Sequence, residues 1–147
     1  MRGRMYDEIK IGDTAGFSKT ITESDIHSFS AITSDFNPVH VDEVYATTST
    51  LGRKLGGRIA QGMLSASLFS TLIGMYIPGK GSLYYSQTCN FKKPVRIGDT
   101  LRAECEVLEK LDKNRIRMAT RCINQHGEVV VDGEALASTA RNVEDVE

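Results

Sequence analysis

The segment from residue 35 to residue 40 carries the side chains best suited to acid/base chemistry, a carboxylate at Asp35 and an imidazole at His40. Because these groups differ in pKa, one can remove a proton while the other delivers one. Pro38 disfavours the α conformation at Asn37, and the resulting break in the backbone would let both groups reach one water molecule. Asn37 could orient either partner. A capped turn with a surface histidine is the alternative interpretation, because Asx-Pro turns are common.

A second candidate site lies at Gly62, where a glycine-rich loop enters a long apolar segment. The first N–H groups of a helix have no partner within it, and they lie at the positive end of the helix dipole. Since Gly62 has no side chain, a carbonyl oxygen could approach its N–H closely, which would make an oxyanion site. The alternative is that Gly62 only lets the helix pack tightly against a strand.

The elements that would position these groups follow a helical pattern in the first half of the chain. Thr22 and Asp25 have the spacing of a capping box, and the restriction imposed by Pro38 ends the first predicted helix near Ser34. A short second helix is expected to start at Asp42, and a loop rich in glycine and basic residues follows over residues 52–58. Residues 62–76 are apolar nearly all round, which predicts a long helix covered on several faces.

The second half of the chain alternates between apolar and polar residues, the pattern of strands with one buried face. This alternation runs over residues 101–107 and 116–122, and a turn at residues 125–128 precedes a further strand over residues 129–137. Consecutive antiparallel strands and one long buried helix predict an α+β fold in which the sheet can wrap around the helix. No repeat or linker divides the sequence, so residues 1–147 are expected to form a single domain.

Composition argues against several classes of function. A formal net charge of −1 offers no general attraction to nucleic acid or to an anionic membrane, so neither is expected as a partner. Cys89, Cys105 and Cys122 are odd in number and far apart, so they predict neither a disulfide framework nor a metal site. The polar amino terminus lacks the apolar core of a secretory signal, and the apolar segment is shorter than the roughly 20 residues of a membrane span. We therefore expect a cytoplasmic protein.

Several blocks, in order along nearly the whole chain, resemble the MaoC-like and R-specific enoyl-CoA hydratases, a family with the hot-dog fold. The blocks are Thr20-Ile-Thr-Glu-Ser-Asp-Ile, Ser34-Asp-Phe-Asn-Pro-Val-His-Val-Asp, Ala60-Gln-Gly-Met-Leu, Pro78-Gly-Lys-Gly-Ser and Phe91-Lys-Lys-Pro-Val-Arg-Ile-Gly-Asp-Thr-Leu. Each block alone is weakly specific, whereas the ordered set is highly specific.

The resemblance implies roles for the residues singled out above. Asp35 and His40 would be the catalytic pair, Gly62 would supply the oxyanion N–H, and the sheet would wrap the long central helix. It also implies a homodimer or a dimer of dimers with each active site at a subunit interface, and no metal or redox cofactor. Two positions depart from the family: Ser34 replaces a common glycine, and Gln61 replaces the histidine that commonly precedes the oxyanion glycine. Gln61 can form hydrogen bonds but cannot titrate near neutral pH.

The activity expected from this resemblance is reversible hydration of a trans-2-enoyl-CoA thioester to the (R)-3-hydroxyacyl product, with coenzyme A as part of the substrate. Because Asp35 and His40 come from one turn, they would add hydroxyl and proton to the same face of the double bond, which is syn addition. The bulk of Ile73 favours short acyl chains. Contacts with the substrate are expected from Asn37, Gln61, Ser70 and Ile73.

Two other functions remain open on the residues alone. An acyl-CoA thioesterase of the hot-dog fold also needs a carboxylate, a water molecule and an oxyanion N–H, so the fold does not separate it from a hydratase. A non-catalytic acyl-binding scaffold domain would keep the apolar tunnel and lose the acid/base pair. The presence of both Asp35 and His40 favours the hydratase over both alternatives.

Overall fold

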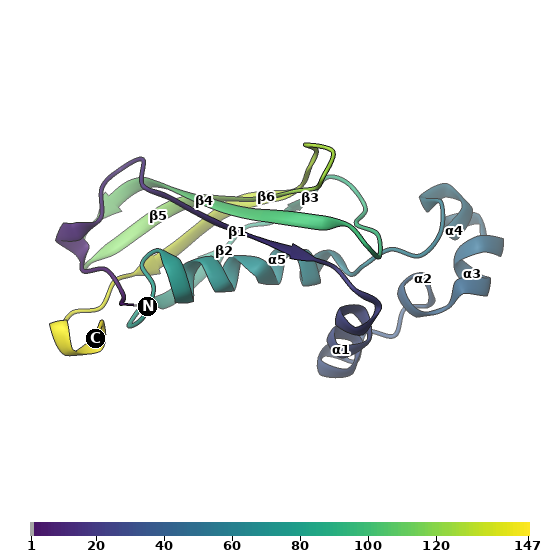
Figure 1. The fold of residues 1–147 in the computed structure, drawn as a ribbon, viewed down its shortest axis with the longest axis horizontal. Helices are drawn as coiled ribbons and strands as arrows, with labels where there is room; N and C mark the ends of the chain where they lie inside the picture. The colour runs from purple at the N-terminus through teal and green to yellow at the C-terminus, as the bar shows by residue number, and fades with distance from the viewer. Residues whose placement is uncertain (1) are drawn as a thin grey trace.

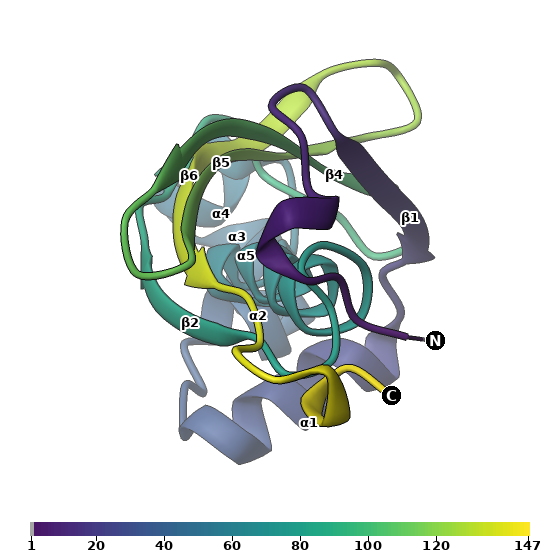
Figure 2. The same cartoon turned by 90° about the vertical axis from the view of Figure 1, so that its left-hand side faces the viewer.

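The computed structural model describes residues 2–147 and contains one curved antiparallel sheet of six strands. The strand order is β1-β4-β5-β6-β2, and β3 also pairs with β6. The strands are β1 (Thr14–Thr20), β2 (Leu83–Gln87), β3 (Asn90–Phe91), β4 (Thr100–Leu111), β5 (Arg115–Ile123) and β6 (Val129–Ser138). Helix α5 (Gly62–Thr71) runs along the sheet in Figure 1, and Figure 2 shows the sheet curving around it. This arrangement confirms the predicted α+β hot-dog fold.

The alternation along the strands decides which face of the sheet meets α5. The apolar rows of β4 and β5 are paired in register, with Ala103 opposite Cys122. Both residues are buried, whereas Arg102 and Arg121 on the alternate positions are exposed. Phe69 of α5 is fully buried in the same core, which contributes about 1.5–3 kcal/mol of hydrophobic stabilisation. The strands predicted over residues 101–107, 116–122 and 129–137 are confirmed; β1, β2 and β3 were not predicted.

The ends of helix α1 (Glu23–Thr33) agree with the prediction. The Asp25 N–H donates to Thr22 Oγ1 at 3.2 Å, and the Thr22 N–H donates to the Asp25 carboxylate at 2.8 Å. The helix ends at Ser34, whose φ of 62° lies in the left-handed region. A glycine would adopt this conformation without the steric cost that serine incurs, which explains why glycine suits this position.

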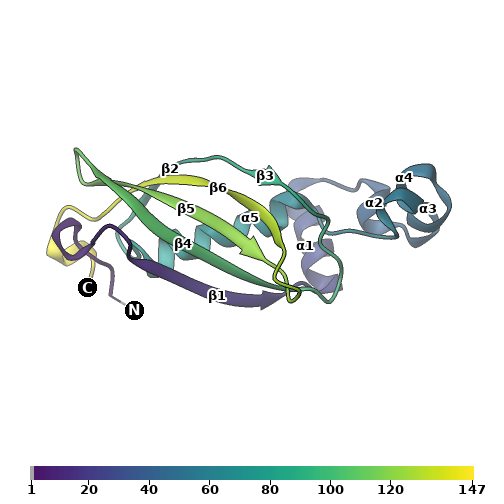
Figure 3. The same ribbon diagram turned by 90° about the horizontal axis from the view of Figure 1, so that it is seen from above.

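The segment between α1 and α5 is more helical than the sequence predicted. The helix expected to start at Asp42 is α3 (Glu43–Thr48), and Asp42 caps it. Helices α2 (Pro38–Val41) and α4 (Thr50–Leu55) were not predicted. The expected loop over residues 52–58 was wrong for its first half, because Ser49 caps α4 through a 2.9 Å bond from the Gly52 N–H. Figure 3 shows α2, α3 and α4 projecting past the end of the sheet at which α5 begins.

The long apolar helix is α5 followed by a π-helical turn, η2 (Leu72–Tyr76). Most of its circumference is buried, as predicted. One exposed stripe runs along it and consists of Met63, Ser67, Ser70 and Gly74. Short 3-10 helices lie near the two ends of the chain, at η1 (Tyr6–Glu8) and η3 (Val143–Asp145). Within residues 2–147 every helix is too short or too polar to cross a bilayer.

Candidate active site

A cavity of about 430 Å³ opens at the amino end of α5. It brings together four of the residues that the sequence singled out: Asp35, His40, Gln61 and Gly62. Most of its remaining wall is apolar and includes Leu55, Met63, Phe91, Val95, Val130 and Val131. A carboxylate and an imidazole therefore lie against a largely apolar wall.

The Asp35 carboxylate and the His40 imidazole face each other across a gap of 3.8 Å between Oδ2 and Nε2. This distance is too long for a direct hydrogen bond, but it leaves both atoms within reach of one water molecule. The Asp35 side chain is 45% exposed and the His40 side chain 10%. The other carboxylate oxygen of Asp35 accepts the Asn37 N–H at 3.2 Å, which leaves Oδ2 to face the histidine.

A backbone carbonyl sets the tautomer of His40. Its Nδ1 lies 2.8 Å from the carbonyl oxygen of Ile59. Because a carbonyl oxygen can only accept, Nδ1 carries the hydrogen of the neutral ring, and the lone pair of Nε2 faces Asp35. In its neutral form the imidazole therefore presents the Nε2 lone pair to the cavity.

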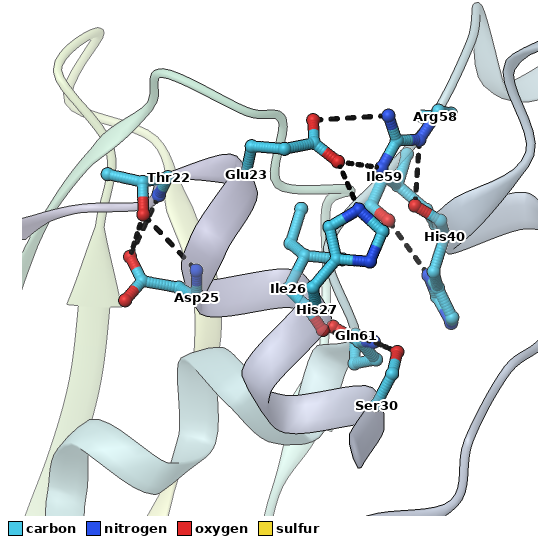
Figure 4. Close-up of polar contacts among 10 residues, drawn as sticks. All are labelled: Thr22, Glu23, Asp25, Ile26, His27, Ser30, His40, Arg58, Ile59 and Gln61. Atoms are coloured by element: carbon cyan, nitrogen blue, oxygen red, sulfur yellow. Dashed lines mark hydrogen bonds and ion pairs between the residues drawn. The ribbon is translucent and has the colours of Figure 1, made fainter.

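Arg58 links α1 to the backbone of His40, as Figure 4 shows. Its Nε donates to the His40 carbonyl at 2.8 Å, and its terminal nitrogens donate to the two Glu23 oxygens at 2.5 and 3.1 Å. The guanidinium of Arg58 holds the pKa of Glu23 below its usual range. Sequence reasoning missed this link, because a lone arginine beside a glycine pair carries no local signal of a partner 35 residues away.

Gly62 begins α5 and packs against the ring of Phe91. A Cβ at this position would lie 2.8 Å from Phe91 Cδ1, so any larger residue would have to displace the ring from this packing. The close packing that the sequence left as an alternative is therefore present. The oxyanion role stays a prediction, and it suits an N–H in the first turn of a helix.

Gln61 lies next to Gly62 and is buried, with 2% of its surface exposed. Its Nε2 donates to Ser30 Oγ at 2.9 Å and to the Ile26 carbonyl at 3.4 Å, as Figure 4 shows. The amide thus ties the start of α5 to α1. This is a positioning contact that a histidine at residue 61 would have to replace.

Three other predicted substrate contacts lie outside the described lining of the cavity. The Asn37 side chain accepts the Val39 N–H at 3.3 Å and caps α2. Ser70 is exposed on α5, and Ile73 is buried in the core. Their contacts with a substrate stay predictions.

The cysteines are free thiols. Burial raises the pKa of Cys105 to about 11 and that of Cys122 to about 12, so both stay protonated near neutral pH. In the part of the chain that the structure describes, no three His, Cys, Asp or Glu side chains are grouped so that they could hold a metal ion.

The sequence and the fold are both similar to those of known hydratases and dehydratases. Residues 8–128 match the family described as MaoC like domain. The chain is 39% identical over 145 residues to the 3-hydroxybutyryl-CoA dehydratase of Methylorubrum extorquens, covering 98% of this chain and 89% of that protein. It is 43% identical over 131 residues to the (R)-specific enoyl-CoA hydratase of Rhodospirillum rubrum, covering 88% of each. An unliganded R-hydratase from Pseudomonas aeruginosa superimposes with a TM-score of 0.88 at 45% identity, covering 96% of this chain and 88% of that one.

Proposed function

We propose that this chain, which belongs to the MaoC-like domain family, is an (R)-specific enoyl-CoA hydratase that reversibly hydrates trans-2-enoyl-CoA thioesters. The observation that carries the proposal is the 3.8 Å gap between Asp35 Oδ2 and His40 Nε2 in the wall of the cavity. A carboxylate and an imidazole that face each other can bind one water molecule, take one of its protons and return a proton to the substrate. The named activities of the relatives support the same reaction.

In the proposed reaction, the N–H of Gly62 and the positive end of α5 polarise the thioester carbonyl and make carbon 3 electrophilic. A water molecule donates hydrogen bonds to Asp35 Oδ2 and His40 Nε2, and its oxygen bonds to carbon 3. One of its protons passes to the pair, and carbon 2 of the resulting enolate takes a proton from the pair. The elements of one water are thereby added across the double bond, and the reverse sequence is dehydration. The apolar wall excludes bulk water, which strengthens these interactions.

Stereochemistry and substrate size follow from the same arrangement. Asp35 and His40 approach from one side, so hydroxyl and proton add to the same face of the double bond. The (R) product is proposed because relatives that share 43–45% of this sequence are named as R-specific hydratases. The preference for short acyl chains stays a proposal from the sequence, because Ile73 lies in the core and outside the lining of the cavity. The mechanism needs no cofactor beyond the coenzyme A of the substrate. A reducing compartment such as the cytoplasm suits the free thiols.

We also infer a homodimer formed through the open edge of the sheet. β2 is the last strand of the sheet, and its residues Leu83, Tyr84 and Tyr85 are large and exposed. Phe91 and Met63, at the cavity, are also exposed apolar residues. An exposed apolar edge favours pairing with another chain. A second subunit on this side would also cover the cavity, which a dry active site needs.

Hydration of crotonyl-CoA tests the proposed activity. The decrease in enoyl absorbance would be followed beside an assay for free thiol, and the product would be resolved by chiral chromatography. We expect (R)-3-hydroxybutyryl-CoA and no thiol release. Thiol release without hydration would indicate a thioesterase, and tight binding without either reaction would indicate an acyl-binding domain.

A further inference from the structure

Two residues that line the cavity each carry a buried polar side-chain atom with no hydrogen-bond partner among the described residues. These atoms are Gln61 Oε1 and Ser65 Oγ, and they account for two of the three unpaired buried side-chain atoms found there. Both residues line the cavity that contains Asp35 and His40, and each is only 2% exposed. Because a buried polar atom without a partner is costly, two of them in one cavity point to a ligand group that pairs with them.

The orientation of the Gln61 amide follows from its partners. The Ile26 carbonyl can only accept, so it must face Nε2, which also donates to Ser30 Oγ (Figure 4). Oε1 is therefore the end of the amide that is left unpaired, and it is an acceptor. Gln61 is the residue immediately before α5 and Ser65 lies in the first turn of that helix, so both stand at the amino end of α5, where the cavity opens.

The hydroxyl of Ser65 can both donate and accept. Ser67, on the exposed side of the same helix, instead donates to the Leu64 carbonyl at 2.6 Å. A pure acceptor beside a hydroxyl matches a group that donates one hydrogen bond and can take part in another. An O–H group has this chemistry, whereas an alkyl chain does not.

We propose that Gln61 Oε1 and Ser65 Oγ form a polar subsite for an O–H group in the otherwise apolar cavity. The O–H group belongs either to an ordered water molecule or to a hydroxyl carried by the acyl chain. An unsubstituted chain that displaces the O–H group leaves both atoms unpaired, so the subsite selects against such a chain, whereas a water that stays in place keeps both atoms paired. The identity of the substrate rests on the proposed function, whereas the subsite rests on the two unpaired atoms.

A crystal structure of the unliganded protein tests the subsite without any turnover. We expect an ordered water within hydrogen-bond distance, about 2.7–3.2 Å, of both Gln61 Oε1 and Ser65 Oγ. A Ser65 hydroxyl bonded to the Gln61 backbone carbonyl, with no water at Oε1, would overturn the proposal. This result is independent of whether the chain hydrates enoyl thioesters.

Kinetics with matched substrates separate the two sources of the O–H group. Hex-2-enoyl-CoA is compared with 5-hydroxypent-2-enoyl-CoA, in which a hydroxyl replaces the terminal methyl, and the comparison is repeated with longer pairs. In Gln61→Met and Ser65→Ala, we expect kcat/KM to shift towards the methyl member of a pair by about 10-fold or more, while the control Ser67→Ala keeps the wild-type ratio. If the wild type has a higher kcat/KM for the hydroxyl member of a pair, the partner of the subsite is a hydroxyl on the acyl chain. If kcat/KM is equal for both members, the partner is an ordered water molecule.

The same ratio in the wild type, Gln61→Met and Ser65→Ala at every chain length, together with no ordered water at Gln61 Oε1 and Ser65 Oγ, would refute the subsite. Failure to hydrate any member of the series would refute the proposed function and leave the crystallographic test of the subsite in force.

Discussion

Replacement of Arg58 by alanine would remove the link between α1 and His40. The change deletes the 2.8 Å bond to the His40 carbonyl and both bonds to Glu23. The Arg58 side chain is only 12% exposed, so the carbonyl loses its donor where water has little access, which costs about 1–3 kcal/mol. The ion pair contributes no more than about 1 kcal/mol, because the Glu23 side chain is 48% exposed and solvent screens it. We expect the free energy of unfolding to fall by about 1–4 kcal/mol.

The same variant should lower kcat more than it changes KM. His40 keeps its bond to Ile59, but its backbone is less well held, and a misplacement of about 1 Å can lower a rate by roughly 100-fold. We therefore expect kcat to fall by about 10–100-fold. KM should change little, because Arg58 lies outside the described lining of the cavity.

Urea unfolding and steady-state hydration of crotonyl-CoA measure the two effects of Arg58→Ala. Arg102→Ala is the matched control, because Arg102 pairs with Glu104 while its own side chain is 56% exposed. This control should lose no more than about 1 kcal/mol of stability and keep its activity. An Arg58→Ala enzyme with reduced stability and wild-type kcat would show that the link serves only the fold.

Three further predictions concern the fold, the subunit edge and residue 61. Gln61→His should remain active in the hydration assay, because the amide of Gln61 has no group that titrates near neutral pH and transfers no proton in the proposed reaction; complete inactivation with the fold intact would contradict this. Light scattering should give at least twice the 16.2 kDa of one chain, and Tyr85→Asp at the open edge should shift the protein towards monomer; a wild-type monomer at micromolar concentration would refute the dimer. Asp25→Ala should lower the free energy of unfolding by about 1 kcal/mol through loss of the capping box. Lys19 lowers the pKa of Asp25 below its ordinary value of 3.8, so this stabilisation is present above that pH and is lost as the pH falls through the lowered pKa; a difference from wild type that grew under acid would contradict the assignment.

Local patterns predicted those parts of the fold that local interactions control. The ends of α1 follow from the Thr22 and Asp25 cap and from Pro38, and β4 and β5 follow from strict alternation. β2 was not predicted because its residues are almost all exposed, so it lacks that alternation. α4 was not predicted because its glycine and basic residues outweighed the signal of the Ser49 cap.

In the candidate site too, residues close together in sequence could be predicted, whereas contacts between distant residues could not. Asp35 and His40 stand in one short segment, so their spacing alone predicted that they could act together. The contacts that orient them could not be predicted, because Ile59 and Arg58 reach His40 from 19 and 18 residues away. The packing of Phe91 on Gly62 is likewise a long-range contact. Periodicity in the sequence carries no information on such pairs.

The activity of Asp35→Asn tests the proposed mechanism most directly. Asparagine keeps the shape of the side chain and removes the carboxylate, so kcat for crotonyl-CoA should fall by at least about 100-fold. His40→Gln should behave in the same way, and the double variant should be scarcely worse than the worse single variant, because residues that act as one unit are non-additive. Circular dichroism would establish that each variant is folded. Wild-type kcat in a folded Asp35→Asn enzyme would contradict the assignment of Asp35 and His40 as the acid/base pair.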